Sequence, residues 1–200
     1  MKIGILGGTF NPIHIGHMEM ASIAADVFGL DDVMLIPTGN PPHKSKDDIL
    51  SKYERYELCL LSATEYDNIF VSSIEIDRDG YTYTIDTLNE LEKVYGLKDD
   101  IYFIIGGDTV LQLEKWREFK EVFKRCKFIA FGRVGMDESS ILNKIEFLKK
   151  EYGAKIGYIT ADIMNIASRD LRDMIKSGES VAGLIPARAV EYISRYNLYA

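Results

Sequence analysis

Short apolar runs alternate with longer amphipathic segments along most of the chain. The apolar runs are rich in isoleucine, valine and phenylalanine, a composition typical of strands that are buried on both faces of a sheet. Four of them are clear, at Lys2–Leu6, Asp32–Ile36, Ile101–Ile105 and Lys127–Phe131, and two more are expected at Ile69–Ile76 and Lys155–Ile159.

The segments between these strands carry apolar residues at the spacing of a helix. Three of them end at a glycine, which readily adopts the left-handed conformation that closes a helix. The predicted helices are Ile15–Phe28, Leu50–Glu65, Thr84–Tyr95 and Ser139–Tyr152, followed near the end of the chain by Ser168–Lys176 and Pro186–Arg195.

This alternation favours right-handed crossovers between parallel strands. The sequence therefore predicts an α/β fold, a Rossmann-like parallel sheet with helices on both faces and further helices at the C-terminus, in one domain over residues 1–200. Ligands of such sheets bind beyond the carboxyl ends of the strands. The segment Pro37–Asp48 is rich in prolines and basic side chains and is predicted to be a mobile loop that could act as a lid.

Composition narrows the class of protein. With 46% hydrophobic and 28% charged residues, the chain has the balance of a soluble globular protein. Its net charge of -7 argues against non-specific binding to nucleic acid or to an anionic membrane. No run approaches the ~18 apolar residues of a membrane span, and Cys59 and Cys126 are expected to be buried free thiols. We therefore expect a cytoplasmic protein.

The first strand leads into a helix through a segment that contains Gly7, Gly8 and two histidines. Glycines permit close backbone approach, and the amides at a helix N-terminus attract phosphate. His14 and His17 are three residues apart, so both rings can face one side of the first turn and donate to phosphate oxygens. Either histidine alone could simply cap the helix. A zinc site is less well supported, since His43 is the remaining histidine and has no cysteine near it.

The segment Gly7 to His17, G-G-T-F-N-P-I-H-I-G-H, resembles the first motif of nucleotidyltransferases of the HxGH class, in particular their nicotinate mononucleotide branch. The resemblance continues along nearly the whole chain. Asn40–Lys44 is similar to the P-P-H-K loop of that branch, and Tyr83–Leu88 to its Y-T-x-D-T-L segment. Gly106–Asp108 is similar to its G-x-D turn, and Trp116 stands where the branch has a tryptophan.

Near the C-terminus, Ile166–Arg172 resembles the I-S-S-T-x-I-R segment of the superfamily. Ala167 and Arg169 replace a serine and the threonine of that segment, so a guanidinium is available where the family has a hydroxyl. Ser168 is predicted to be the N-cap of the helix that follows, a purely structural role that local sequence alone would favour. The resemblance adds a second role for this helix, in which Ser168 and Arg172 contact the triphosphate.

The resemblance implies that the phosphate of nicotinate mononucleotide attacks the α-phosphorus of ATP and releases pyrophosphate, with Mg²⁺ bridging ATP oxygens. A phosphate is already a nucleophile, so alignment of the reactants and neutralisation of charge can suffice. The residues implied are His14, His17 and Lys44 in catalysis; Gly7, Gly8, Thr9, Phe10, Gly106, Asp108, Ile166, Ser168 and Arg172 at ATP; and Asn40, Thr84, Trp116 and Arg133 at the mononucleotide.

Four of these roles can be given a physical form. Lys44 is expected to close over the reacting phosphates. Trp116 is expected to stack on the pyridine ring, although core packing is the commoner use of a tryptophan. The helix beginning near Thr84 offers amides to the nicotinate carboxylate, and Asp86 in its first turn weakens that field. Asp108 is expected to hold nucleotide hydroxyls or an ordered water.

Three alternative functions share part of this sequence pattern. Phosphopantetheine adenylyltransferase shares the HxGH and serine–arginine elements but is not expected to carry the P-P-H-K and Y-T-x-D-T-L segments. An NAD-dependent dehydrogenase needs G-x-G-x-x-G, and Gly4, Gly7 and Gly8 are wrongly spaced for it. A non-catalytic nucleotide-binding regulator stays open, because only pyrophosphate release separates it from the enzyme. The expected partners are ATP and nicotinate mononucleotide, and a homo-oligomer also stays open.

Overall fold

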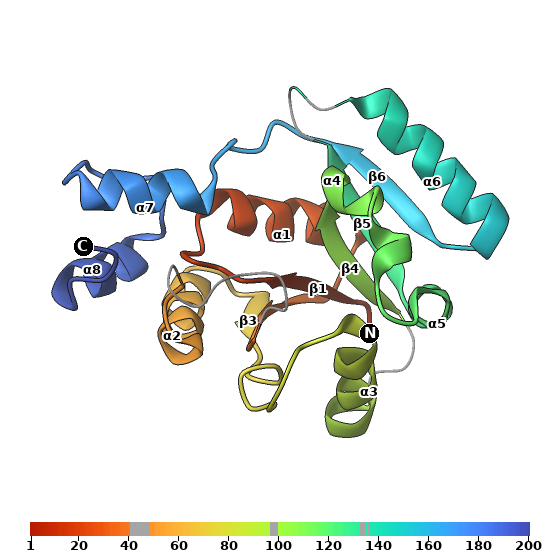
Figure 1. The fold of residues 1–200 in the computed structure, drawn as a ribbon, viewed down its shortest axis with the longest axis horizontal. Coiled ribbons are helices and arrows are strands. Elements are labelled where there is room, and N and C mark those ends of the chain that lie inside the picture. The colour runs from red at the N-terminus through yellow and green to blue at the C-terminus, as the bar shows by residue number, and fades with distance from the viewer. Residues whose placement is uncertain (41–48, 97–99, 133–134, 136) are drawn as a thin grey trace.

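Parallel strands form a sheet in the order β3-β2-β1-β4-β5-β6 (Figure 1). The computed structural model describes residues 1–40, 49–96, 100–132, 135 and 137–200. The strands of this sheet are β1 Ile3–Gly8, β2 Asp32–Pro37, β3 Ile69–Val71, β4 Ile101–Gly106, β5 Lys127–Gly132 and β6 Ile156–Thr160. The prediction of a Rossmann-like parallel sheet is confirmed.

The strand order reverses direction beside β1. The chain passes outward from β1 through β2 to β3, returns to pair β4 with the other side of β1, and continues to β5 and β6. Ile3 is accordingly in register with Asp32 on one side and with Ile101 on the other. The carboxyl ends of β1 and β4 therefore meet at a topological switch point, which is where open α/β sheets bind their ligands.

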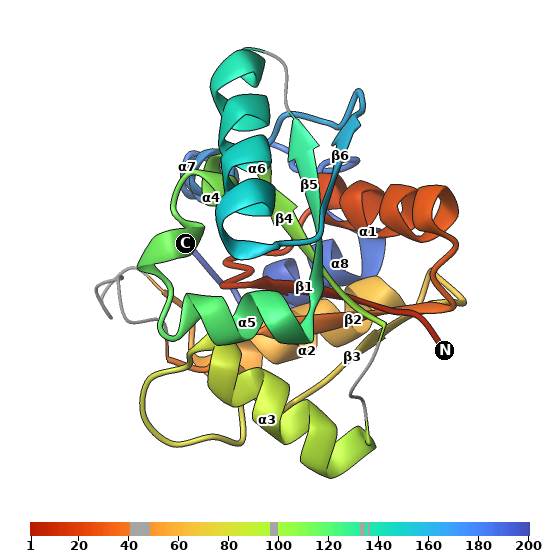
Figure 2. The same ribbon diagram turned by 90° about the vertical axis from the view of Figure 1, so that its right-hand side faces the viewer.

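Helices cover both faces of the sheet (Figures 1 and 2). On one face the strands pack against α1 Ile15–Phe28, α2 Lys52–Ala63, α7 Ser168–Lys176 and α8 Ala187–Arg195. The other face packs against α3 Thr84–Tyr95, α4 Gly107–Val110, α5 Phe119–Arg125 and α6 Glu138–Tyr152. Successive strand residues alternate between the two cores, as the two-residue period of a strand requires.

The predicted bounds of α1, α3 and α7 agree with the structure. The expected helix Leu50–Glu65 is shorter, because Ser51 caps it and it spans Lys52–Ala63, and one expected strand also needs correction. The expected strand Ile69–Ile76 ends at Val71. Ser72 still donates its N–H to the carbonyl of Leu35 at 3.0 Å, but the hydroxyl of Ser73 then bonds the carboxylate of Asp77 and the chain turns away. The helices α4 and α5 were missed, because four and seven residues hold too few turns to show a helical period.

The C-terminal residues return to the first half of the chain. Helix α8 packs beside α2, and Leu198 is buried in the core on that face of the sheet. Figure 1 shows α7 and α8 together at the end of the molecule that also carries α2. No helix in the described part of the chain is long and apolar enough to cross a membrane.

Candidate active site

A cleft of about 540 Å³ opens at the switch point between β1 and β4. Its walls come from the segment after β1, from the first turn of α1, from the start of α3 and from the turns that follow β4. The polar and aromatic side chains that line it include Thr9, His17, Thr38, Glu75, Thr82, Thr84, Asp108, Thr109 and Trp116. The cleft lies where the fold predicts a ligand.

The two motif histidines stack on each other at the start of α1. His14 is the N-cap residue and is 4% exposed, and its ring centroid lies 3.7 Å from that of His17 with the planes 30° apart. The backbone N–H of His14 donates to Nδ1 of His17 at 3.3 Å, and the Phe10 ring meets the His17 ring edge-on. Because Nδ1 of His17 accepts this hydrogen bond, the proton of the neutral ring is on Nε2, which makes that nitrogen a donor. His17 also lines the cleft.

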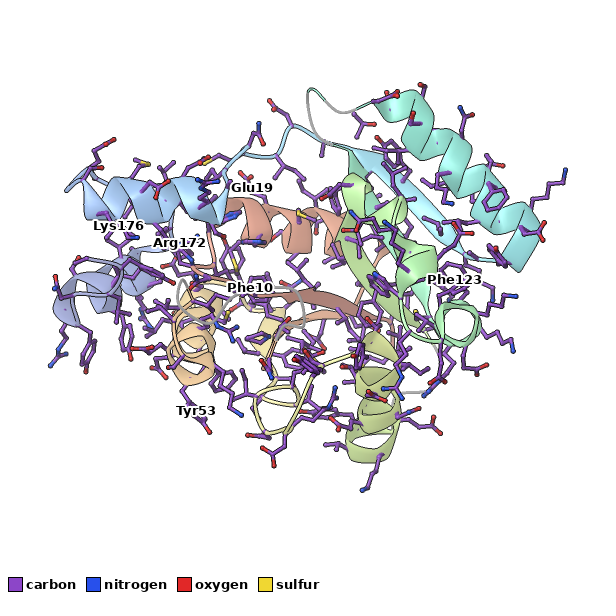
Figure 3. All side chains as sticks on the ribbon, in the orientation of Figure 1. Phe10, Glu19, Tyr53, Phe123, Arg172 and Lys176 are labelled. Carbon is purple, nitrogen blue, oxygen red and sulfur yellow. The ribbon has the colours of Figure 1, made fainter. Side chains whose placement is uncertain are left out.

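The glycine between the histidines brings α1 against the chain that leads to α7. A Cβ at Gly16 would lie 2.8 Å from the carbonyl oxygen of Met164, so a larger residue would push the two segments apart. Glu19, one turn further along α1, accepts the backbone N–H of Met164 at 2.8 Å (Figure 3). The glycine of the HxGH motif therefore lets α1 pack closely against the segment before α7, in addition to separating the two histidines.

Helix α7 binds the motif segment through side chains. The hydroxyl of Ser168 donates to the carbonyl of Pro12 at 2.9 Å. Nη1 of Arg172, which is labelled on α7 in Figure 3, donates to the carbonyl of Asn11 at the same distance. The prediction that Ser168 is the N-cap of this helix is therefore wrong. Ala167 is the N-cap residue, and the hydroxyl of Ser168 bonds a neighbouring segment instead. Both residues are therefore bonded directly to the segment that carries the histidine motif.

A fully buried arginine ties together the segments that form the floor of the site. Arg55 on α2 is 1% exposed, and its Nη1 donates to the carbonyl of Thr9 at 2.7 Å. Nη2 donates to the carbonyls of Thr38 and Gly39, and Nε to that of Leu50. Burial lowers the pKa of Arg55, but a guanidinium starts from a pKa so high that it stays charged at neutral pH.

The opposite wall of the cleft comes from α3 and from the turn after β4. Thr84 is the first helical residue after the N-cap Tyr83, so the backbone amides of this turn face outward from the helix. Trp116 is half-buried, packs edge-on against Phe128 and also lines the cleft. Its indole therefore packs against the core and also forms part of the wall of the cleft.

The sequence from residue 5 to residue 177 matches the family described as cytidylyltransferase-like. The chain belongs to the cytidylyltransferase-like family. A probable nicotinate-nucleotide adenylyltransferase from Thermoanaerobacter sp. (strain X514) is 41% identical to it over 199 residues, covering 100% of this chain and 94% of the relative. A protein of the same description from Clostridium perfringens (strain SM101 / Type A) is 35% identical over 198 residues, covering 99% and 98%.

Solved structures of similar proteins share the fold of this family member. The Plasmodium falciparum nicotinic acid mononucleotide adenylyltransferase complexed with NaAD superposes with a TM-score of 0.79 at 20% identity, covering 99% of this chain and 97% of that one. The same protein complexed with APC gives a TM-score of 0.77 at 19% identity, covering 99% and 96%. These likenesses support the Rossmann-like architecture.

The structure gathers most of the expected site residues of this cytidylyltransferase-like chain at one edge of the sheet. Ile166 instead packs on the core beside the motif, and Asn40 lines a neighbouring hollow. Lys44 and Arg133 lie outside the described residues. The expected residues that line the cleft itself are Gly7, Gly8, Thr9, His17, Thr84, Gly106, Asp108 and Trp116.

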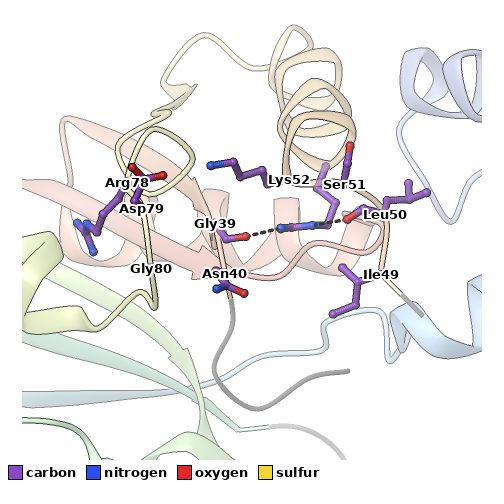
Figure 4. A pocket seen from close by; sticks show the side chains of 10 residues that line it. Gly39, Asn40, Ile49, Leu50, Ser51, Lys52, Arg78, Asp79 and Gly80 are labelled. Atoms are coloured by element: carbon purple, nitrogen blue, oxygen red, sulfur yellow. Dashed lines mark hydrogen bonds between the residues drawn. The ribbon is translucent and has the colours of Figure 1, made fainter. Parts of the chain in front are cut away.

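The neighbouring hollow has a volume of about 410 Å³ and lies beside the ends of the segments that Arg55 binds (Figure 4). Its basic side chains already bind other groups. The ammonium of Lys52 donates to the carbonyl of Ile76 at 2.6 Å, and the guanidinium of Arg78 pairs with Glu90. The hollow therefore offers less positive charge than its composition suggests.

Glu75 is a buried carboxyl group that sequence reasoning missed. It is 9% exposed, lines the cleft and accepts a hydrogen bond from the hydroxyl of Thr87 at 2.6 Å. Burial raises its pKa, while Thr87 and the nearby charge of Arg78 act in the opposite direction. The chain leaving β2 passes so close that a Cβ at Gly39 would lie 2.0 Å from the Glu75 carbonyl oxygen.

Arg55 was also missed, although the sequence held a signal for it. It lies on the same face of α2 as the buried Leu58, Cys59 and Ser62. A charged residue on the apolar stripe of an amphipathic helix indicates a buried cation with fixed partners.

Replacement of Arg55 by methionine should lower the free energy of unfolding by about 3–5 kcal/mol, because buried carbonyl groups lose their donor. Urea denaturation measures this loss. The matched change Arg188→Met, at an exposed position on α8, should alter the same quantity by no more than about 0.5 kcal/mol. Equal effects of the two changes would contradict the role assigned to Arg55.

Glu75→Gln should raise the melting temperature more at about pH 8 than at about pH 4. A carboxyl group whose pKa is raised by folding favours the native state while it is protonated, and this contribution is lost as the pH rises through the folded pKa. Glutamine keeps an acceptor for Thr87 and carries no charge. Thermal unfolding at both pH values measures the difference, with Glu191→Gln at an exposed position of α8 as the control. An equal change in melting temperature at both pH values for Glu75→Gln would contradict the prediction.

Proposed function

We propose that this chain transfers the adenylyl group of ATP to nicotinate mononucleotide, forming deamido-NAD and pyrophosphate for NAD biosynthesis. The observation that carries the proposal is a single cleft with two unlike walls. One wall holds the histidine motif and the loop after β1, and the other holds the start of α3 and the indole of Trp116. The names of relatives that match the whole chain support the same reaction.

ATP is assigned to the wall that carries the histidine motif. Its phosphates would meet Nε2–H of His17 and the backbone amides near Thr9, at the positive end of α1. Arg172 would reach the β- and γ-phosphates from α7. It uses one N–H on Asn11, and a guanidinium has five such donors in a fixed plane.

The mononucleotide is assigned to the wall formed by α3 and Trp116. The pyridine ring would stack on the indole, and the nicotinate carboxylate would accept hydrogen bonds from the amides near Thr84. Asn40, Lys44 and Arg133 are assigned to the phosphate end of this substrate and to the reacting phosphates. This arrangement points the phosphate of one substrate toward the α-phosphorus of the other.

The reaction requires alignment more than a protein nucleophile. The attacking phosphate already carries the electron pair, so the protein's part is to hold both reactants and to neutralise charge on the leaving pyrophosphate. Within the described residues, no three histidine, cysteine, aspartate or glutamate side chains are grouped as a metal site. Mg²⁺ that arrives with ATP would neutralise charge on the triphosphate. We place the reaction in the cytoplasm.

A coupled pyrophosphate assay with ATP tests the function and its selectivity together. We expect kcat/KM to favour nicotinate mononucleotide over nicotinamide mononucleotide by roughly 10- to 150-fold, because the neutral amide leaves charge-assisted hydrogen bonds unmade. Asp86 in the first turn of α3 keeps the preference from being larger. Equal or inverted ratios would refute the assigned pocket, and ATP binding without pyrophosphate release would indicate a regulator.

His17→Ala should lower kcat by roughly 100- to 1000-fold, because its ring is placed to stabilise charge that grows in the transition state. Steady-state kinetics at saturating substrates measure the loss, and circular dichroism and the melting temperature check that the fold is intact. A well-folded variant with near-normal kcat would show that the ring only completes the first turn of α1.

A further inference from the structure

The end of the chain is bonded to the histidine motif. The hydroxyl of Tyr199, the penultimate residue, donates to Oδ1 of Asn11 at 3.0 Å, across 188 residues of sequence. Asn197 and Tyr199 both have left-handed backbone conformations, with φ of 52° and 66°, which turn the tail inward. Non-glycine residues seldom adopt this conformation without compensating contacts. The tail is therefore held in place by what it touches.

Asn11 is the point at which three separate parts of the chain meet. Its Oδ1 also accepts the backbone N–H of Leu50 at 3.1 Å, just before α2. Its backbone carbonyl accepts Nη1 of Arg172 from α7. The side chain of Asn11 is nearly fully buried, so a shift of its amide would move both neighbours.

The phenol of Tyr199 remains a donor over the ordinary pH range. Burial raises its pKa, and the charges of Arg172 and Arg55 only partly offset that effect. Leu50, which shares the acceptor on Asn11, also gives its carbonyl to Nε of Arg55. The tail hydroxyl thus joins the same set of bonds that fixes the floor of the cleft.

We infer that Tyr199 is a positioning residue for nucleotidyl transfer, whose hydroxyl fixes Asn11 so that Arg172 is presented to the triphosphate of ATP. This inference rests on the proposed function for the role of Arg172. Arginine has a long, flexible side chain, and holding one of its N–H groups on a fixed carbonyl lowers the entropy lost when the others bind phosphate. A less firmly held Asn11 should therefore weaken the binding of ATP more than the binding of the mononucleotide.

The test compares Tyr199→Phe with Tyr196→Phe. Phenylalanine keeps the ring at each position and removes only the hydroxyl, and Tyr196 is a matched tail residue that is 56% exposed. We expect Tyr199→Phe to raise KM for ATP by about 3- to 10-fold, the effect of one lost hydrogen bond, with KM for the mononucleotide changed less than about 2-fold. Tyr196→Phe should change neither constant.

A double-mutant cycle separates positioning from general stability. If Tyr199 acts through Arg172, Tyr199→Phe should cause little further change in KM for ATP when Arg172 is already replaced by alanine. Equal rises in both KM values, an unchanged KM for ATP, or an effect that persists in that background would overturn the inference, whether or not the melting temperature falls.

Calorimetric titration with ATP alone keeps this result separate from the proposed function. A wild-type chain that forms deamido-NAD while Tyr199→Phe binds ATP normally would refute the inference and leave the function intact. A wild-type chain that forms no dinucleotide would refute the function, and the titrations of wild type, Tyr199→Phe and the Arg172→Ala pair would still decide whether Tyr199 acts on ATP through Arg172.

Discussion

The guanidinium of Arg55 lies beneath the active edge of the sheet and binds carbonyl groups that follow both β1 and β2. These carbonyls are buried or partly buried and would lose this donor without the guanidinium, so the arginine and the loops stabilise each other. The segment between β1 and α1 is thereby held in one conformation, and this fixes the position of the two histidines at the start of α1. A buried, permanently charged side chain also leaves a positive charge under the cleft to which we assign the triphosphate, in a chain whose net charge is -7.

The site is built from contacts that approach it from several directions. Arg55 holds the motif from α2, Ser168 and Arg172 hold it from α7, and Tyr199 holds it from the C-terminal tail. The carbonyl groups of one short segment are therefore occupied by side chains. In the first turn of α1 the N–H of Ile15 is bonded to the carbonyl of Leu184 at 2.9 Å, so the backbone around the motif is fixed as well. Rigid placement of donors in this way is what catalysis by alignment and charge neutralisation needs.

Periodicity in the sequence was enough to predict the sheet, most helices and the edge at which the cleft opens, because these follow from local patterns and from the handedness of crossovers. The long-range bonds could not be predicted in the same way. Ser168 has the local pattern of an N-cap, and only the tertiary structure shows that its hydroxyl is used on Pro12. Tyr199 is 188 residues from Asn11, and nothing in either neighbourhood indicates the other. Short helices such as α4 could not be predicted, because about one turn is too short for the apolar spacing to repeat.

The stereochemical course at the α-phosphorus tests direct transfer most sharply. If the mononucleotide phosphate attacks ATP while both lie in the cleft, the reaction is one in-line displacement, and a single diastereomer of α-thio-ATP should give a dinucleotide with inverted configuration at phosphorus. Retention would mean that the adenylyl group passes through a covalent intermediate on the protein. That result would contradict an active site that works by alignment and charge alone.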